Sequence, residues 1–256
     1  VTAGMRLDDN DDFGRHTSYR LSAAYVVDLG AGSNIKYRAS FGTGFRAPSL
    51  SEIAYNAGPS AYAPATLAEL TEETSEGYEF AVEYFGNEGL YLEAVYFDQE
   101  LTDELYFDLI AFSGYLQAEG QGHSSGVELS VEQAFASGLW LSANYTYNET
   151  ESPGDVNRSR RPEHLANLSL SYDILPDRWS VIVNYRVAKD AVNEIFGLGF
   201  VELDDYEVLD LSTNYSLTEQ ASVYLRVENA TNEDYEEVTG YQTAGSSLYV
   251  GARYSF

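Results

Sequence analysis

Two short segments of the sequence contain residues that could do chemistry. Asp8, Asn10 and Asp12 cluster side-chain oxygens, which are the ligands that a hard cation such as Ca²⁺ requires. The spacing of an EF-hand and its closing Glu are missing, so a solvated loop is the simpler interpretation. His123 and Ser125 are two residues apart, and in a strand they would share one face, where the His can activate the Ser as a general base. Both possibilities depend on the elements that carry these residues.

Composition excludes several classes of protein. The 256 residues include 14 Lys and Arg against 41 Asp and Glu, for a formal net charge of −27. We therefore expect no nucleic acid partner, because phosphate binding requires a basic surface. The chain has no Cys, which rules out disulfides and thiolate metal sites within it. No apolar run is long enough for a transmembrane helix, but a barrel strand needs only about 9–11 residues of alternating polarity.

The dominant pattern has a period of two residues. Between positions 139 and 147, one face reads Leu139, Leu141, Ala143, Tyr145 and Tyr147, and the other reads Trp140, Ser142, Asn144 and Thr146. The same alternation recurs along the chain and predicts about twelve antiparallel strands. Two stretches, 90–109 and 112–136, read almost unbroken and predict long strands joined by a tight turn at Ile110–Ala111.

A soluble β-sandwich would also alternate, but three features favour a transmembrane barrel. The strands are long, the polar face carries charged and amide side chains that suit a wet lumen, and aromatic residues recur at the ends of the apolar faces. These aromatic residues are Tyr145, Tyr147, Tyr172, Trp179, Tyr185, Tyr215 and Tyr254. The connections alternate between short and long, as expected for periplasmic turns and extracellular loops. We therefore predict an all-β, antiparallel transmembrane β-barrel.

Several strings in the sequence resemble a known family. Tyr37–Leu50 reads YRASFGTGFRAPSL, and the chain ends in SSLYVGARYSF. In this order they resemble the C-terminal half of TonB-dependent receptors, and the likeness covers nearly all of residues 1–256. One departure is Asn229-Ala-Thr-Asn232, where the family commonly has Asn-Leu-Phe-Asp.

The resemblance implies a 22-stranded barrel around a plug, in the outer membrane of a Gram-negative bacterium. It also implies a TonB box, a plug domain and about ten earlier strands, none of which is in this sequence. The TonB–ExbB–ExbD complex would energise transport through those N-terminal parts. Outer-membrane lipids, lipopolysaccharide and the barrel assembly machinery are the other expected partners. For the assembly machinery, the expected signal is the last apolar face: Leu248, Val250, Ala252, Tyr254 and Phe256.

The expected function is uptake of a scarce, large solute and not catalysis. The segment 234–245, DYEEVTGYQTAG, resembles the cobalamin (vitamin B12) receptor branch, while ferric-siderophore receptors share the rest of the pattern. We expect no resident cofactor, apart from Ca²⁺ if the acidic loop binds it. Ligand contacts are expected from aromatic residues of the long loops: Tyr55, Tyr62, Phe196, Phe200 and Tyr241.

Two other functions remain open at this stage. Twelve strands can close on themselves, which would make the chain a passive outer-membrane channel. Alternatively, the GHSSG string at 122–126 partly resembles the motif of an outer-membrane phospholipase, with His123 and Ser125 facing lipid. No Asn that would orient the His is identifiable from the sequence.

Overall fold

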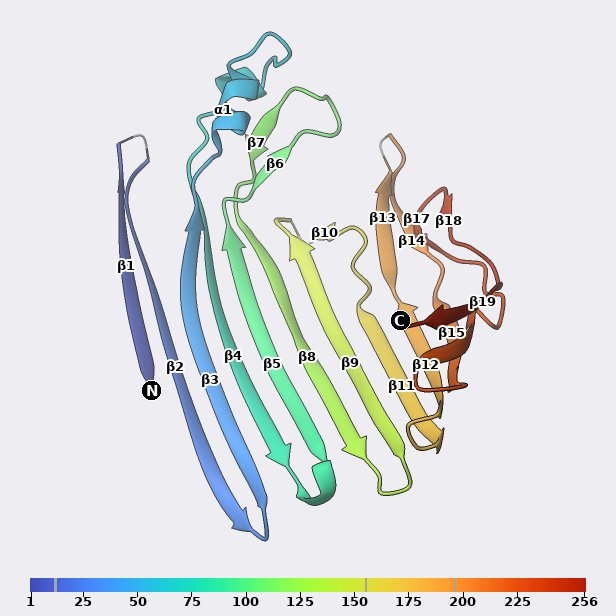
Figure 1. Ribbon diagram of the computed structural model, residues 1–256. Coiled ribbons are helices and arrows are strands. Elements are labelled where there is room, and N and C mark those ends of the chain that lie inside the picture. Colours follow the sequence, from blue (N-terminus) through green and yellow to red (C-terminus); the bar gives the residue numbers. More distant parts are fainter. Residues whose placement is uncertain (12, 155, 196) are drawn as a thin grey trace.

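A computed structural model describes residues 1–11, 13–154, 156–195 and 197–256, which form one large curved sheet (Figure 1). Its long strands are β1 (Thr2–Asn10), β2 (Gly14–Gly30), β3 (Ser33–Arg46), β4 (Glu73–Phe85), β5 (Tyr91–Thr102), β8 (Gln121–Ala134), β9 (Leu139–Ser152), β11 (His164–Leu175), β12 (Trp179–Lys189), β15 (Tyr206–Ser216), β16 (Ala221–Glu228) and β19 (Ser247–Tyr254). They pair in chain order and antiparallel throughout, which confirms the predicted fold class and strand number for the described residues.

The connections of this sheet alternate between short and long, except that only three residues separate β1 from β2 at the outer end. Short turns at 31–32, 86–90, 135–138, 176–178 and 217–220 lie at one end, here called the inner end. The longer outer loops carry the remaining elements: α1 (Leu50–Asn56), η1 (Ala65–Leu67), β6 (Leu105–Phe107), β7 (Tyr115–Gln117), β10 (Val156–Asn157), β13 (Ala191–Ile195), β14 (Gly199–Leu203), β17 (Glu236–Val238) and β18 (Tyr241–Gln242). Only η2 (Asn87–Gly89) lies in an inner turn. None of the described helices is long and apolar enough to cross a membrane.

The predicted Ile110–Ala111 turn between two unbroken strands is wrong. Strand β5 ends at Thr102 and β8 begins at Gln121, and the residues between them form an outer loop with the hairpin β6–β7. Left-handed backbone at Asp103 (φ 58°) and an unusual φ of 110° at Gly120 interrupt the strands. A small hairpin alternates as a long strand does, so period-two matching alone cannot separate them.

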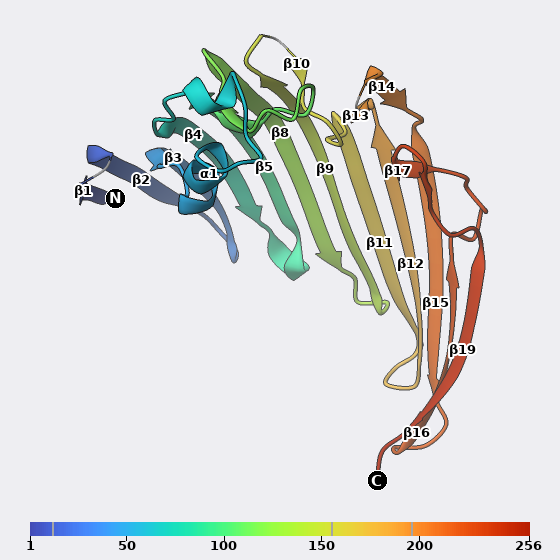
Figure 2. The same ribbon diagram turned by 90° about the horizontal axis from the view of Figure 1, so that it is seen from above.

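The sheet curves into an open trough with a concave and a convex face (Figure 2). Strands β1 and β19 form its two edges and do not pair with each other in the described chain. The structure therefore gives no support to a self-contained twelve-stranded channel, whose first and last strands would have to pair.

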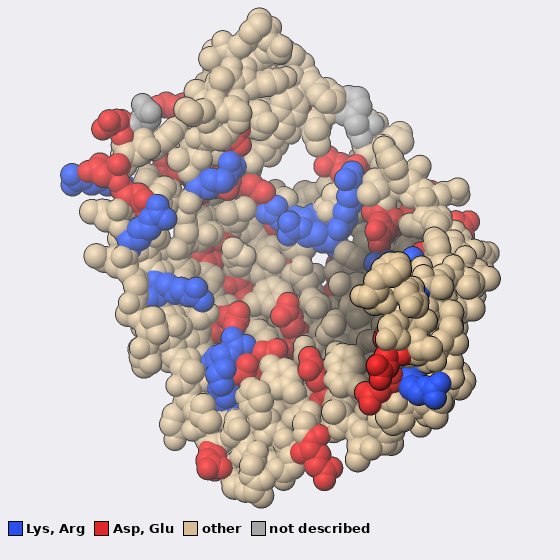
Figure 3. Space-filling model, viewed as in Figure 1, with Lys and Arg blue, Asp and Glu red and all other residues tan. Residues whose placement is uncertain are grey.

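Register separates the two faces by polarity. Figure 3 shows Lys, Arg, Asp and Glu side chains across the hollowed face. The convex face is apolar and exposed, as at Tyr25, Leu248 and Val250. Its aromatic residues gather near the strand ends, with Tyr172, Trp179, Tyr215 and Tyr254 toward the inner turns and Tyr145, Tyr147 and Tyr185 toward the outer loops. This is the arrangement of a barrel wall, with lipid outside and water inside.

An introduced charge should destabilise the protein much more on the convex face than on the concave face. Leu170 lies on the convex face of β11, where it pairs with Leu141 and Val183. Leu170→Arg should lower the free energy of unfolding by about 2–4 kcal/mol, because the charge would enter hydrocarbon. Ser171→Arg, one residue away on the concave face, should change it by less than about 1 kcal/mol. Urea unfolding in phospholipid vesicles measures both, and equal effects would contradict the assignment of faces.

Candidate functional site

The outer loops above β3–β8 pack into one body. The Asn56 side chain at the end of α1 donates to the Tyr115 carbonyl and accepts from its N–H, both at 2.8 Å. The Tyr62 N–H donates to the Ser113 carbonyl at 3.0 Å. These bonds join loop 47–72 to loop 103–120 through partly buried polar groups, which are costly to separate once formed.

An aromatic cluster stabilises the same contact. The Tyr55 ring lies edge-on to Phe107 and Tyr115, at centroid distances of 5.4 and 5.8 Å. Phe107 and Tyr115 also meet edge-on at 5.2 Å. Tyr55, expected to contact the ligand, is thus engaged in packing the loops together in this structure.

Ion pairs extend the connections to neighbouring elements. Arg46 binds Glu52 of α1 at 3.0 Å and Glu73 at 2.6 Å. Burial alone would raise the pKa of Glu52, but hydrogen bonds from the Ser49 backbone and from Arg46 outweigh it and lower that pKa. Arg158 pairs with Glu104 through two bonds of 2.7 and 2.8 Å, and so ties loop 153–163 to loop 103–120.

The outer loops above β11–β19 meet at Asn193, which is 3% exposed. Its carbonyl oxygen accepts from Arg160 Nε at 2.7 Å, and its amide donates to Thr239 at 3.0 Å. The Glu194 N–H donates to the Ser159 hydroxyl at 2.9 Å. Three loops distant in sequence are thereby held together at one buried amide.

Asn229 likewise holds chain segments together, at the base of the last loop, 229–246. Its carbonyl oxygen accepts from the Glu233 N–H at 2.7 Å, while its amide donates to the Glu233 and Ala244 carbonyls. Asn232 accepts from the Ser246 N–H at 2.9 Å. The segment that departs from the family pattern is therefore held by amide hydrogen bonds.

Arg186 connects this loop to the concave face. Its Nη2 donates to the Tyr235 hydroxyl at 3.1 Å and lies 3.2 Å from Glu237 Oε1. Tyr206 and Tyr235 stack at 4.2 Å, and the guanidinium lies 5.3 Å from the Tyr206 ring centroid. These four residues, the Arg186 cluster, combine a cation, a carboxylate and two rings.

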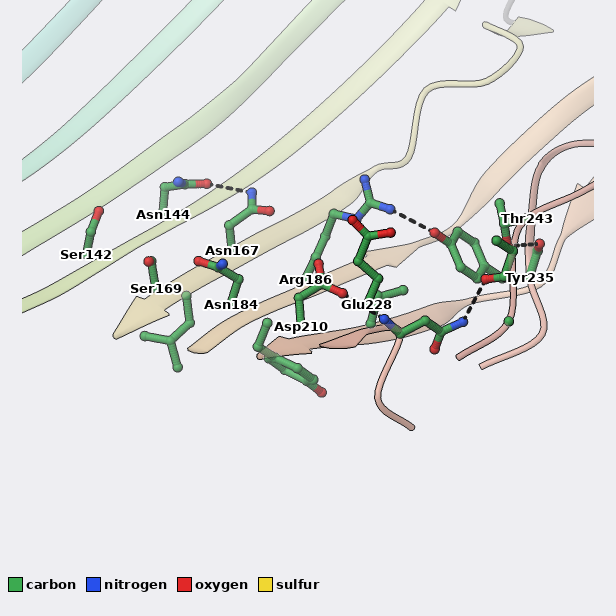
Figure 4. A pocket seen from close by; sticks show the side chains of 16 residues that line it. Ser142, Asn144, Asn167, Ser169, Asn184, Arg186, Asp210, Glu228, Tyr235 and Thr243 are labelled. Carbon is green, nitrogen blue, oxygen red and sulfur yellow. Dashed lines mark hydrogen bonds between the residues drawn. The ribbon is translucent and has the colours of Figure 1, made fainter. Parts of the chain in front are cut away.

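Two recesses flank the Arg186 cluster. The mouth recess, about 400 Å³, lies among the outer loops and is lined by residues that include Arg160, Leu165, Arg186, Ala188, Tyr206 and Glu237. The inner recess, about 530 Å³, lies on the concave face (Figure 4). Its lining includes Ser142, Asn144, Asn167, Ser169, Asn184, Arg186, Asp210, Glu228, Asn229, Tyr235 and Thr243. Both volumes fall in the range of small-molecule sites.

The expected ligand contacts are spread over the outer loops. Tyr62 is 50% exposed, Phe200 on β14 is 45% exposed and Tyr241 on β18 is 75% exposed, so all three remain available to a ligand. Phe196 lies outside the described residues. Sequence reasoning missed Tyr206 and Tyr235. Tyr235 lies in the cobalamin-like segment, but its stacking on Tyr206 joins residues 29 positions apart (235 − 206), and no local pattern signals that contact.

Asp8 and Asn10, expected in a solvated loop, lie at the outer end of β1 and have partners there. Arg6 donates to Asp8 Oδ1 at 2.6 Å, and the Phe13 N–H donates to Asn10 at 3.3 Å. Asp12 lies outside the described residues. Among the residues that are described, no three His, Asp or Glu side chains are grouped closely enough to hold a metal ion.

His123 and Ser125 share the convex face of β8, as predicted. His123 Nε2 lies 3.5 Å from Asp98 Oδ2 on β5, and the Tyr96 hydroxyl donates to the same oxygen at 3.2 Å. The Ser125 hydroxyl makes no hydrogen bond within the described chain. The contact between His and Ser that nucleophilic catalysis requires is therefore not formed in this structure.

Comparison with known proteins shows to which family this architecture belongs. The family described as TonB dependent receptor-like, beta-barrel, matches residues 1–230. The chain belongs to this family. TonB-dependent receptors are transporters and receptors. The concave face is accordingly the wall of a barrel lumen.

Relatives and solved structures agree with this assignment. The vitamin B12 transporter BtuB of Photobacterium profundum is 28% identical over 98% of this chain, and that of Vibrio cholerae is 23% identical over all of it. The ferripyoverdine receptor of Pseudomonas aeruginosa superposes with a TM-score of 0.74 over 95% of the chain at 17% identity. The chain spans 40% of the length of the two transporters and 33% of that receptor.

The contact between the first two long loops depends on Gly114. Its φ is 141°, and a Cβ added there would lie 2.5 Å from Asn56 Oδ1 and 2.8 Å from the Ala65 Cβ. Gly114→Ala should weaken the contact locally by about 2 kcal/mol and make both loops more sensitive to protease. Gly154→Ala is the control, because its φ of 91° imposes strain in open space. Equal protease sensitivity of the two variants would show that the contact is not required.

The β6–β7 loop should also loosen in acid. Hydrogen bonds from the Ser113 hydroxyl (2.6 Å) and from the Ala111 and Ile110 N–H groups lower the pKa of Asp108 below its ordinary value. A lowered folded pKa means that this stabilisation is complete above the unfolded pKa of about 4 and is lost as pH falls through the folded value. NMR shifts of the Ile110 and Ala111 amides should titrate below pH ~4. Asp108→Asn should abolish that titration, and its persistence would assign it to another group.

Proposed function

We propose that this chain forms the barrel wall and outer loops of an outer-membrane receptor that takes up cobalamin, with TonB supplying the energy. The observation that carries the proposal is the group of connected outer loops beside a polar trough, in a chain that belongs to the TonB-dependent receptor family. Such loops form a preorganised mouth, which lowers the entropic cost of capturing a scarce solute. Cobalamin is favoured because transporters named for vitamin B12 align over 98–100% of the chain.

A ferric siderophore is the second candidate ligand. The fold of the ferripyoverdine receptor superposes on this chain, although their identity of 17% supports only the fold. Energy transfer from the TonB–ExbB–ExbD complex would act through parts of the receptor outside this sequence. The proposed location is the outer membrane of a Gram-negative bacterium, which suits the apolar convex face and its two aromatic bands.

The assembly signal remains a prediction. Leu248, Val250, Ala252 and Tyr254 share the convex face of β19, and Phe256 follows as the last residue of the sequence. Exposed apolar side chains on one face of a strand suit recognition by the barrel assembly machinery.

The binding proposal is tested on the full-length receptor purified from outer membranes. Isothermal titration should detect saturable binding of cyanocobalamin and none of a ferric siderophore. The reverse selectivity would replace cobalamin by the second candidate. No binding of either would overturn the proposed ligands while leaving the family assignment intact.

Tyr241 offers the sharpest substitution for the same assay. Because its side chain is 75% exposed, Tyr241→Ala should leave folding unchanged and remove an aromatic contact to the ligand. We expect about tenfold weaker binding, the equivalent of about 1.4 kcal/mol. Tyr25→Ala is the matched control, with 70% exposure on the convex face of β2. Equal affinities for the two variants would remove Tyr241 from the site.

A further inference from the structure

An apolar groove of about 500 Å³ crosses the convex face of β4, β5, β8 and β9, four strands that lie side by side (Figure 1). These strands are in the middle of the sheet, so the groove does not depend on either edge. The convex face of a barrel wall meets hydrocarbon, and a lipid chain is therefore what can fill the groove. Its lining includes four short side chains, Val82, Ala94, Val131 and Ala143, and the residues Tyr84 and Tyr145.

The same strands carry a set of polar groups nearer the outer loops. On β5 the Tyr96 hydroxyl donates to Asp98 at 3.2 Å, and on β9 the Tyr147 hydroxyl donates to Glu149 at 3.3 Å. Ser125 of β8 lies between the two strands, directly opposite Asp98 on one side and Glu149 on the other. These five residues, the outer polar site, thus place two carboxylates and two rings on either side of a short hydroxyl side chain.

The charge around the outer polar site favours a cation. Strands β4, β5, β8 and β9 contain no Lys or Arg, and His123 is their one titratable base. His123 Nε2 lies 3.5 Å from Asp98 Oδ2. In the next row outward, Glu76, Glu100 and Glu151 add further negative charge to the same face. An ammonium group would be attracted here and could also contact the tyrosine rings, whereas a purely anionic headgroup would be repelled.

The separation between the outer polar site and the groove fits one lipid molecule. Four residues along β5 lead from Asp98 to Ala94, and four along β8 lead from Ser125 to Leu129, which also lines the groove. At about 3.4 Å per residue and a strand tilt of about 40°, this corresponds to about 10 Å of membrane depth. One hydrocarbon leaflet is about 15 Å thick. A lipid with its headgroup at the outer polar site would therefore lay an acyl chain in the groove.

We propose that the outer polar site and the groove together bind one molecule of phosphatidylethanolamine. Its ammonium group would pair with the carboxylates of Asp98 and Glu149, and its phosphate would accept a hydrogen bond from the Ser125 hydroxyl beside the His123 ring. One of its acyl chains would fill the groove. This inference goes beyond the proposed function and is independent of the solute that the receptor takes up, because the site faces the membrane and not the lumen.

The first test uses the full-length wild-type receptor, purified from outer membranes and delipidated in detergent. Native mass spectrometry during lipid titration measures the dissociation constants of phosphatidylethanolamine and of phosphatidylglycerol with the same acyl chains. Phosphatidylethanolamine should bind about tenfold more tightly, because only its headgroup carries an ammonium group for the two carboxylates. Equal or reversed affinities would overturn the proposal, and this comparison does not depend on the folding of any variant.

A substitution on β9 tests the headgroup contact. Glu149→Gln should reduce the preference for phosphatidylethanolamine about threefold, and adding Asp98→Asn should abolish it. Glu207→Gln is the matched control, because Glu207 is also an exposed carboxylate on the convex face that accepts from a tyrosine hydroxyl, that of Tyr185. An unchanged preference in the double variant, or an equal loss in the control, would remove the outer polar site from lipid binding.

A second pair of variants tests the groove. Ala94→Trp should weaken the binding of both phospholipids about fivefold, because the ring would occupy the space of the acyl chain. Ala39→Trp is its control, since Ala39 is likewise exposed on the convex face, on β3 and outside the groove. Equal affinities of these two variants would show that the groove holds no chain. Displacement of phosphatidylethanolamine by lipopolysaccharide with Mg²⁺, reversed by a chelator, would overturn the choice of an ammonium headgroup.

Discussion

Backbone hydrogen bonding in a medium without water is the constraint on which this structure depends. Hydrocarbon offers no partner to an N–H or a carbonyl, so each strand must pair along its whole membrane-crossing length. Within the described chain, the ten strands between β1 and β19 meet this demand on both sides through one antiparallel ladder in chain order. Continuous pairing sets the register, and register decides which face of the sheet each side chain occupies.

The lumenal surface follows directly from that register. Because side chains alternate along each strand, every second residue points into the lumen. These residues line up with the lumenal residues of the neighbouring strands and form rows across the sheet. Asn144, Asn167 and Arg186 come from three strands yet form one row. A shift of one residue in β11 would turn Asn167 toward lipid and Leu168 toward water, at a cost in both places. The strand pairing that stabilises the barrel wall therefore also fixes which side chains line the inner recess.

The outer loops obey a different rule, because water is available there. Their order comes from side chains that bond to groups of other loops or of distant parts of the same loop, as Asn56, Asn193 and Asn229 do. Such bonds contribute little individually, but a buried amide left without its partners would be costly, so the loops gain or lose order together. A mouth built in this way keeps its shape while exposed aromatic residues such as Tyr241 remain free to meet a ligand.

The sequence by itself determined the strand number, the faces, the sidedness of the loops and the family, because alternation and loop length are local properties that a barrel wall imposes on every strand. It placed His123 and Ser125 on the convex face for the same reason. It did not reveal the β6–β7 hairpin, whose residues alternate as a membrane strand would. Only the tertiary structure joined Tyr206 to Tyr235, Asn193 to Thr239 and Arg186 to both recesses. Those contacts link residues far apart in the chain, and their geometry depends on the curvature of the sheet and on how the outer loops pack above it.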